Sequence, residues 1–460
     1  MQSDQAPTTE HRGKPAFLDI DFEKSPFIVI WEITRACDLK CVHCRAEAIP
    51  NRNPNELTWE QGTKLLEDCA AFGDNKPIFV FTGGDPNKHP ELCKYISYAD
   101  KLGLRVAVTP SATPLLTREA IFEMRDAGLT RMAISIDGSN AEIHDNFRKQ
   151  PGSFDHTMRA LRDALDAGLT IQVNTTICKW NINDIDNLCD LMRELGLTLW
   201  SAFFLVPTGR GEIGDEISPE QFEEAFEKMY ELQMEGEFDI KSTAAPHYRR
   251  VVMQHQMAKG SSADSMRFTI PERRKNPRPS GKPTLEELEE QIAAKSGAKP
   301  NDMLGEDESE NTAPWINRKV MPGGWARSDG LGRAARGVND ANGFVFIDHV
   351  GRVHPSGFMP YPAGNVKEES IIDIYRDSKL FKLLRDFKQL KGKCRMCEFR
   401  DVCGGARSRS LALTGDPMAS EPYCIHVPEA LKEYGDHNFW LQPDKLVEDM
   451  TPYIEKHGDV

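Results

Sequence analysis

The sequence lacks long hydrophobic runs and an excess of positive charge. Its longest apolar stretches, such as Phe27 to Trp31, are far shorter than the roughly 20 residues of a membrane-spanning helix. Its first residues contain no apolar segment of the kind that signal peptides carry. The formal net charge of −14 argues against binding to the phosphate backbone of nucleic acid. We therefore expect a cytoplasmic protein with neither a membrane nor a nucleic-acid partner.

The chain also does not have the low hydrophobic content of a disordered protein. Hydrophobic residues make up 39% of its 460 residues, which is enough for a large core. This length predicts more than one structural module. The 11 cysteines are not expected to form structural disulfides in a reducing cytosol, so metal or redox chemistry is the better interpretation.

Between about residues 26 and 206, β-branched and aromatic runs alternate with segments whose apolar residues recur at helical spacing. Six such units predict an α/β fold with a parallel sheet, closed or partly closed into a (β/α)6 TIM-like barrel. The active site of such a barrel lies at the C-terminal ends of its strands. The predicted strands are FIVIWEI (27–33), PIFVFT (77–82), LRVAVTP (104–110), TRMAISI (130–136), TIQVNTTI (170–177) and LTLWSAFFLV (197–206).

The alternating pattern ends after Pro207, and residues 259–314 are rich in charged residues, Ser, Gly and Pro. This composition predicts a flexible insertion. From Asn342 a hairpin-like segment leads into a cysteine-rich region. The predicted organisation is an N-terminal extension (1–25), a barrel (26–240), an insertion (241–341) and a small C-terminal domain (342–460).

The first cysteine group, Cys37, Cys41 and Cys44, follows the first predicted strand in TRACDLKCVHC. Three thiolates at this spacing can bind three irons of a [4Fe–4S] cluster and leave the fourth iron without a protein ligand. A structural zinc site is an alternative, with His43 as its fourth ligand. A chance grouping of core thiols is another.

The CxxxCxxC motif, followed by a βα barrel, resembles the radical SAM superfamily. The resemblance implies that S-adenosylmethionine binds the open iron through its amino and carboxylate groups. An electron from the cluster then cleaves the cofactor to methionine and a 5′-deoxyadenosyl radical, which abstracts hydrogen from the substrate. The cofactor supplies this chemistry and the protein orients it. The resemblance also implies that a reductase, flavodoxin or ferredoxin donates electrons to the enzyme.

Two further features resemble this family. Thr82, Gly83, Gly84 and Asp85 end the second strand like its GGE-type motif, which meets the methionine amino group. Asp85 stands where the family often has Glu, and an ordinary βα turn is the alternative interpretation. His43 occupies the position at which the family usually carries an aromatic residue close to the adenine.

Ser135 and Asp137 end the fourth strand, and with Arg148 they resemble the SxDG…HDxxR stretch of relatives that carry a C-terminal cluster domain. The likeness implies that Ser135 and Asp137 lie near the cofactor ribose or the substrate. Arg148 would pair with the methionine carboxylate, to which a guanidinium fork is suited. A surface turn with its salt-bridge partner is the alternative for Asp137 and Arg148.

The second cysteine group comprises Cys394, Cys397, Cys403 and Cys424. Spacing alone does not separate an auxiliary [4Fe–4S] cluster from a tetrahedral zinc site. After a radical SAM barrel, the group resembles the SPASM or twitch type of extension. The segment GRVHPSGFMPYPAGN contains no cysteine, so we expect one auxiliary cluster rather than two.

The C-terminal segment CRMCEFRDVCGGARSRSLALTGDPMASEPYC resembles radical SAM enzymes of alternative haem and haem d1 synthesis. These oxidoreductases modify propionate side chains of iron-coproporphyrin or the haem d1 precursor, which implies a tetrapyrrole substrate. We expect Arg210 in PTGRG (207–211), with residues 247–250, to bind carboxylates at the barrel mouth. Cys178, at the end of the fifth strand, is a second candidate catalytic residue, although core packing also explains a buried thiol.

Other functions remain open at this point. A radical SAM maturase of a ribosomally synthesised peptide is one, although such relatives commonly carry an N-terminal recognition domain, for which the polar segment before Phe27 leaves no room. A non-catalytic iron–sulfur or zinc-binding protein is another. A zinc hydrolase is disfavoured because the chain has no HExxH motif.

Overall fold

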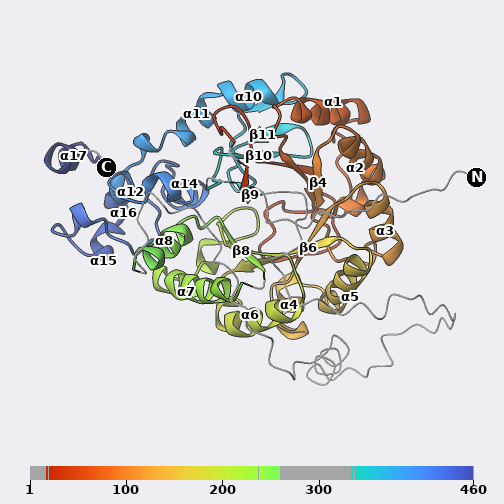
Figure 1. The fold of residues 1–460 in the computed structure, drawn as a ribbon, viewed down its shortest axis with the longest axis horizontal. Helices are drawn as coiled ribbons and strands as arrows, with labels where there is room; N and C mark the ends of the chain where they lie inside the picture. The colour runs from red at the N-terminus through yellow and green to blue at the C-terminus, as the bar shows by residue number, and fades with distance from the viewer. Residues whose placement is uncertain (1–16, 19, 237, 259–332, 335–336, 459–460) are drawn as a thin grey trace, which may run out of the picture.

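The computed structural model describes residues 17–18, 20–236, 238–258, 333–334 and 337–458. Its main feature is a curved sheet surrounded by an outer ring of helices (Figure 1). The chain runs round this ring from α1 (Trp59–Ala70) through α8 (Tyr248–Ala258), α10 (Ile371–Asp377) lies beside α1, and the last helices lie to one side. The predicted flexible segment 259–314 and most of the N-terminal extension fall outside the described residues.

The sheet has ten strands in the order β12-β11-β10-β2-β3-β4-β5-β6-β7-β8. All neighbours from β10 to β8 are parallel, whereas β11 pairs antiparallel with both β10 and β12. The predicted partial parallel barrel is thus confirmed. The strands are β2 (Ile28–Thr34), β3 (Ile78–Gly83), β4 (Arg105–Val108), β5 (Arg131–Ser135), β6 (Thr170–Ile177), β7 (Leu199–Phe204), β8 (Asp239–Thr243), β10 (Phe344–Ile347), β11 (Arg352–His354) and β12 (Gly364–Asn365).

Most barrel helices lie where apolar residues recur at helical spacing, whereas the helices at 141–148 and 248–258 were not predicted. Thr58 begins α1 with a capping box that includes Gln61, and Ser218 caps α7 ahead of Pro219. These helices are α1 (Trp59–Ala70), α2 (Leu92–Lys101), α3 (Arg118–Asp126), α4 (Ala141–Arg148), α5 (Ser153–Asp166), α6 (Ile185–Glu194), α7 (Pro219–Glu235) and α8 (Tyr248–Ala258).

Strand β6 explains how the barrel can be both packed and hollow. Along TIQVNTTI, buried and half-buried residues alternate. The apolar members, such as Ile171 and Val173, belong to the main hydrophobic core. The polar members Gln172, Asn174 and Thr176 line an internal cavity. Because successive strand residues face opposite sides, this alternation gives the barrel an apolar outer face and a partly polar interior.

Two barrel strands were not predicted. Strand β8 (DIKST) has a single apolar residue, Ile240, and therefore carries no hydrophobic periodicity in the sequence. Strand β10 begins the predicted hairpin, and Phe346 does pair with His354 across it. However, β10 also lies parallel to β2, with Phe344 opposite Ile28. The barrel sheet therefore continues across the expected boundary between residues 341 and 342.

The rest of the C-terminal region is built from short helices. It has a small core of its own, formed by Met396, Leu431, Trp440 and Met450. No helix in the described part of the chain is long and apolar enough to cross a membrane. The helices are α10 (Ile371–Asp377), α11 (Lys379–Arg385), α12 (Gly392–Arg395), α13 (Arg400–Cys403), α14 (Arg407–Thr414), α15 (His437–Trp440), α16 (Pro443–Leu446) and α17 (Thr451–His457).

Candidate active site

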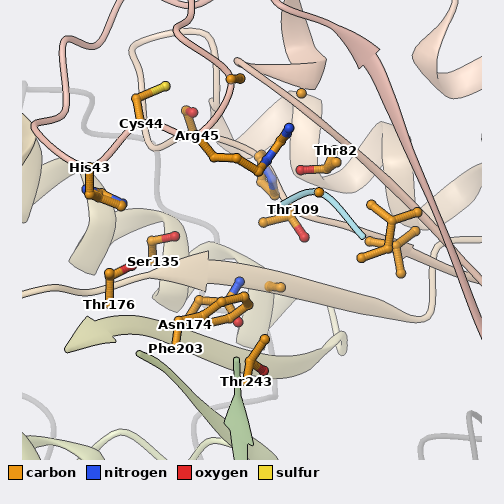
Figure 2. Close-up of a pocket in the computed structure, with 18 of the residues that line it drawn as sticks. His43, Cys44, Arg45, Thr82, Thr109, Ser135, Asn174, Thr176, Phe203 and Thr243 are labelled. Atoms are coloured by element: carbon orange, nitrogen blue, oxygen red, sulfur yellow. The ribbon is translucent and has the colours of Figure 1, made fainter. Parts of the chain in front are cut away.

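The barrel encloses a cavity of about 370 Å³, a volume typical of small-molecule sites. Figure 2 shows His43, Cys44 and Arg45 on the loop after β2, facing side chains that project from the strands. All three cysteines of the first group line this cavity, together with residues of every strand of the parallel part of the sheet. The strands therefore place the cysteine loop against the barrel interior, as the sequence predicts.

Backbone contacts fix the cysteine loop. The amide of Cys37 donates to the carbonyl of Ile49 (2.8 Å), and that of Arg210 donates to the carbonyl of Cys44 (3.1 Å). Gly209 has a φ of +59°, and a Cβ there would lie 2.5 Å from the Cys44 carbonyl oxygen. Only glycine therefore allows the 207–211 loop to pack this closely against the cysteine loop.

Hydrogen-bond donors point at all three sulfurs. The amides of Leu39 and Ala48 donate to the Sγ atoms of Cys37 and Cys44, each at 3.4 Å. Arg148 Nη1 approaches the Sγ of Cys41 at 3.7 Å. Such donors suit sulfur atoms that carry negative charge.

The surroundings of these thiols do not by themselves make them thiolates. Burial raises the pKa of Cys37 to about 11, and it also raises the pKa of Cys41. A bound metal cation removes the proton from a coordinating thiol outright. Three converging thiols with donors at their sulfurs therefore fit a metal cluster better than they fit free nucleophiles.

The glycines that end β3 let it approach the cysteine loop. A Cβ on Gly84 would lie 2.5 Å from the carbonyl oxygen of Ala36, which is backbone. Thr82, Gly83 and Gly84 line the cavity. Asp85 does not, since it is buried and accepts hydrogen bonds from Thr113 and Asn87.

Asp137 and Arg148 form an ion pair beside the cysteine loop. Asp137 is completely buried and also accepts a hydrogen bond from the amide of Thr176 (2.7 Å). Burial excludes the surface-turn interpretation of this pair. Ser135 and Arg148 line the cavity. Because Arg148 contacts both Asp137 and the sulfur of Cys41, it joins the end of β5 to the cysteine loop.

Buried polar atoms near the cysteine loop remain without partners among the described residues. Burial and the charges of Arg148 and Arg210 lower the pKa of His43 well below its ordinary value, so its ring is neutral. Its Nδ1 atom, and Nε and Nη2 of Arg210, have no hydrogen-bond partner among the described residues. Unpaired buried polar atoms are costly, and a polar ligand beside them would satisfy them.

The two candidate catalytic residues lie outside the cavity lining. Cys178 is 1% exposed and packs with Phe147 and Leu205, which fits the core-packing interpretation of this thiol. Arg210 holds the cysteine loop through its backbone amide, and its unpaired Nε and Nη2 atoms lie near His43. The placement of Cys178 therefore gives no support for contact with a substrate, whereas Arg210 keeps buried donors that a polar ligand would satisfy.

The expectation that residues 247–250 line the barrel mouth is wrong. His247 is completely buried against Phe222 and Phe226. Arg250 forms an ion pair with Glu223, and Arg249 donates to the backbone carbonyls of Val338 and Val402. This segment leads into α8, whose first turn packs inside the protein, so the guanidinium groups of Arg249 and Arg250 already have partners there.

Several cavity residues were not predicted. Arg45 directly follows the last cysteine of the first group and lies within the cavity (Figure 2). The aromatic side chains of Phe203, Phe346 and Phe358 line it as well, and the latter two come from the C-terminal region. Strand alternation could have found Phe203, but no local signal identifies residues brought in from so far along the chain.

Residues 31–192 of the chain match the Radical SAM superfamily. The "AdoMet-dependent heme synthase" of Methanosarcina barkeri is 34% identical over 409 residues, which cover 89% of this chain and 99% of that protein. The chain belongs to the radical SAM superfamily. The "Pre-heme d1 synthase" of Dinoroseobacter shibae is 27% identical to this radical SAM chain over 403 residues, which cover 86% of this chain and 85% of that protein.

The fold agrees with solved structures. Streptococcus suis SuiB bound to S-adenosylmethionine matches with a TM-score of 0.55 and 14% identity, over 86% of this chain and 76% of that one. Membership of the superfamily makes the protein an enzyme and implies a [4Fe–4S] cluster and S-adenosylmethionine as cofactors. The thiols, donors and close glycine contacts of the cysteine loop fit these cofactors.

The second cysteine group of this radical SAM enzyme also converges. Burial raises the pKa of Cys403 to about 12, and the nearby thiols of Cys394 and Cys424 add to the effect. Burial and the other three thiols raise the pKa of Cys397 well above its ordinary value. The amides of Glu421 and Gly405 donate to the sulfurs of Cys394 (3.3 Å) and Cys403 (3.4 Å).

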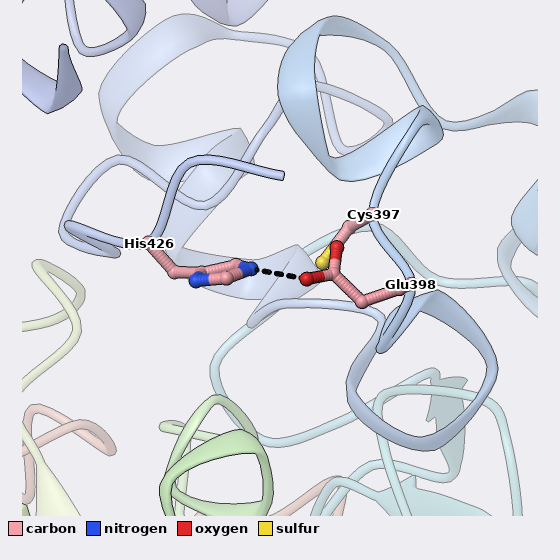
Figure 3. A group of neighbouring side chains, drawn as sticks. All are labelled: Cys397, Glu398 and His426. Carbon is pink, nitrogen blue, oxygen red and sulfur yellow. Dashed lines mark hydrogen bonds and ion pairs between the residues drawn. The ribbon is translucent and has the colours of Figure 1, made fainter. Parts of the chain in front are cut away.

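A histidine and a carboxylate lie beside this group. Figure 3 shows His426 Nε2 bonded to Glu398 Oε1 at 3.0 Å, next to Cys397. The ligand atoms of Cys397, Glu398 and His426 lie within 4.8 Å of one another. The histidine and glutamate thus add polar groups around the four thiols.

Arg409 connects the C-terminal region to the barrel mouth of this radical SAM enzyme. Its side chain is completely buried and donates to the carbonyls of Phe204 (3.1 Å) and Leu205 (2.8 Å), where β7 ends. It also forms ion pairs with the buried carboxylates of Glu216 (3.1 Å) and Glu421 (3.4 Å). Breaking such a buried network leaves uncompensated charges, so it holds the two parts together.

Proposed function

We propose that this radical SAM enzyme oxidatively modifies propionate side chains of a tetrapyrrole. The observation that carries the proposal is the similarity to an AdoMet-dependent heme synthase over 89% of this chain and 99% of that protein. Similarity to a shared barrel alone would cover a much smaller part of both proteins. The aromatic and polar side chains that line the cavity provide further support.

Cys37, Cys41 and Cys44 would hold the [4Fe–4S] cluster of the active site. The backbone at Gly83 and Gly84, together with Ser135, would line the adjoining site for S-adenosylmethionine. When bound, these cofactors supply a strong abstractor of hydrogen atoms. Further residues of that site would be His43, Thr82, Asp137 and Arg148. The buried side chain of Asp85 would support the turn at Gly83 and Gly84.

The protein's own task is to orient the substrate and to exclude water. Phe203, Phe346 and Phe358 offer ring faces and edges to a flat, apolar macrocycle. Thr109, directly after β4, and Asn174 on β6 add polar groups that face the cysteine loop (Figure 2). An apolar wall with a few placed polar groups is typical of a site that binds such a ligand.

We further propose that Cys394, Cys397, Cys403 and Cys424 hold one auxiliary [4Fe–4S] cluster. Four thiolates occupy all four irons, so this cluster would supply electron transfer or structural support rather than bind the substrate. Buried cations suit the negative charge of such a cluster, and Lys393 donates to the Cys424 carbonyl while Arg249 donates to that of Val402. A reductase, flavodoxin or ferredoxin would deliver electrons to the enzyme.

An anaerobic assay tests the function. Reconstituted, reduced enzyme is incubated with S-adenosylmethionine, with and without iron-coproporphyrin III, and 5′-deoxyadenosine and porphyrin masses are followed. We expect cofactor cleavage to rise with the porphyrin and the porphyrin to lose carboxyl mass. Cleavage with an unchanged porphyrin would overturn the tetrapyrrole proposal and leave the superfamily assignment intact.

A further inference from the structure

Arg45 is the cationic side chain of the cysteine loop that lies inside the cavity (Figure 2). Its guanidinium lies over the ring of Phe346, 4.4 Å from the ring centre. A Cβ on Gly357 would lie 3.0 Å from its Cδ atom, so the absent side chain leaves room for the arginine. Two residues of the C-terminal region thus shape the space that Arg45 occupies.

Glu32 fixes one side of this guanidinium. Its Oε2 accepts from Arg45 Nη2 at 2.5 Å, and its Oε1 lies 2.9 Å from His349 Nδ1. Burial alone would raise the pKa of Glu32, but the charge of Arg45 and the hydrogen bond to His349 lower it below its ordinary value. His349 in turn contacts Asn53 (3.2 Å). The carboxylate is therefore anionic and held in place from both sides.

The other side of the guanidinium is available. Among the described residues, Nε and Nη1 of Arg45 make no hydrogen bond, and the side chain is 22% exposed. Each fork of a guanidinium pairs Nη2 with either Nη1 or Nε, so the second Nη2 hydrogen and one of these free donors can meet a carboxylate in two-point contact. A purely structural ion pair between Arg45 and Glu32 would not need the remaining donors to stay open in a cavity.

We propose that Arg45 binds a carboxylate of the substrate, and this proposal rests on the tetrapyrrole function proposed above. The ring of Phe346 and the carboxylate of Glu32 set the plane of the guanidinium, so its free edge selects the position of one propionate. The macrocycle then packs against Phe203 and Phe358, whose ring centres lie 6.4 Å apart. Arg45 is accordingly a specificity-determining residue of the cavity.

Binding measurements separate this role from others. Iron-coproporphyrin III and its tetramethyl ester are titrated into reconstituted enzyme, and the change in porphyrin absorbance gives each Kd. Loss of a hydrogen bond to a charged group predicts that Arg45→Gln weakens binding of the acid about tenfold or more. The ester, which has no carboxylate, should bind Arg45→Gln and unaltered enzyme alike.

Two further variants make the test robust. Arg45→Lys keeps the charge without the fork and should lose less affinity for the acid than Arg45→Gln does. Arg118→Gln is the matched control, because Arg118 lies on α3, is 49% exposed and pairs with Asp163 and Asp166 away from the cavity. It changes the net charge equally and should leave both affinities unaltered. Iron content and circular dichroism confirm that each variant is folded.

Each alternative outcome has a distinct meaning. If the unaltered enzyme binds neither porphyrin, the proposed tetrapyrrole function fails, and the Arg45 proposal fails with it. If the enzyme binds the acid and Arg45→Gln binds it equally well, only the Arg45 proposal is overturned. If Arg45→Gln instead weakens binding of S-adenosylmethionine and spares the porphyrin, Arg45 belongs to the cofactor site and the proposal is again overturned.

Discussion

Substituting Gly84 by alanine tests whether the end of β3 positions the cysteine loop. The added Cβ would lie 2.5 Å from the Ala36 carbonyl oxygen and 2.6 Å from that of Arg35. Ordinary contact begins near 3.4 Å, so the backbone that carries Cys37 must shift by about 0.9 Å. Backbone atoms cannot turn aside as the end of a flexible side chain can. The strain therefore falls on the loop that binds the cluster.

A displacement of about 1 Å in a reacting group can lower a rate on the order of a hundredfold. We expect Gly84→Ala to slow formation of 5′-deoxyadenosine by about that factor, and to lower the iron content after reconstitution. The assay is anaerobic single-turnover cleavage of S-adenosylmethionine. Gly214→Ala is the matched control, since a Cβ there meets nothing within 4 Å. Full cleavage activity and iron content in Gly84→Ala would refute the reasoning.

Three other predictions concern the cysteine groups and the buried network at the barrel mouth. Cys44→Ala should abolish 5′-deoxyadenosine formation, and normal cleavage would contradict the assignment of its cluster. Cys403→Ala should impair turnover while some uncoupled cleavage of the cofactor persists; unaltered product formation would contradict a role for the second group. Burial raises the pKa of Glu216 from 4.5 to about 7 despite the charge of Arg409, so the folded state binds this proton more tightly. The free energy of unfolding should therefore fall as the pH rises from about 4.5 to about 7, and Glu216→Gln should reduce that slope in urea titrations. The same slope in the variant and the unaltered enzyme would contradict the raised pKa of Glu216.

Local patterns predict much of the barrel. Strand β6 alternates along its own length, and helices such as α1 begin at capping residues that the sequence displays. The spacing of Cys37, Cys41 and Cys44 indicates their common site because a single loop carries all three. In each case the interacting residues are close together in the chain, so the sequence alone carries the signal.

Residues brought together from distant segments could not be predicted in this way. Glu32 and His349 are 317 positions apart, and their contact depends on β10 pairing with β2. Arg249 and Arg250 look suited to a carboxylate site, yet backbone carbonyls and Glu223 already pair with them inside the protein. Arg45 carries the same charge but keeps free donors, because Glu32 takes only one side of it. Only the fold distinguishes the two cases.

The most direct test of the central claim follows a hydrogen atom from substrate to cofactor. The enzyme is incubated anaerobically with S-adenosylmethionine and iron-coproporphyrin III that carries deuterium on its propionate side chains. We predict that deuterium appears in 5′-deoxyadenosine while the porphyrin loses carboxyl mass. If the 5′-deoxyadenosine contains no deuterium and the porphyrin is unchanged, the claim that this enzyme acts on tetrapyrrole propionates is contradicted.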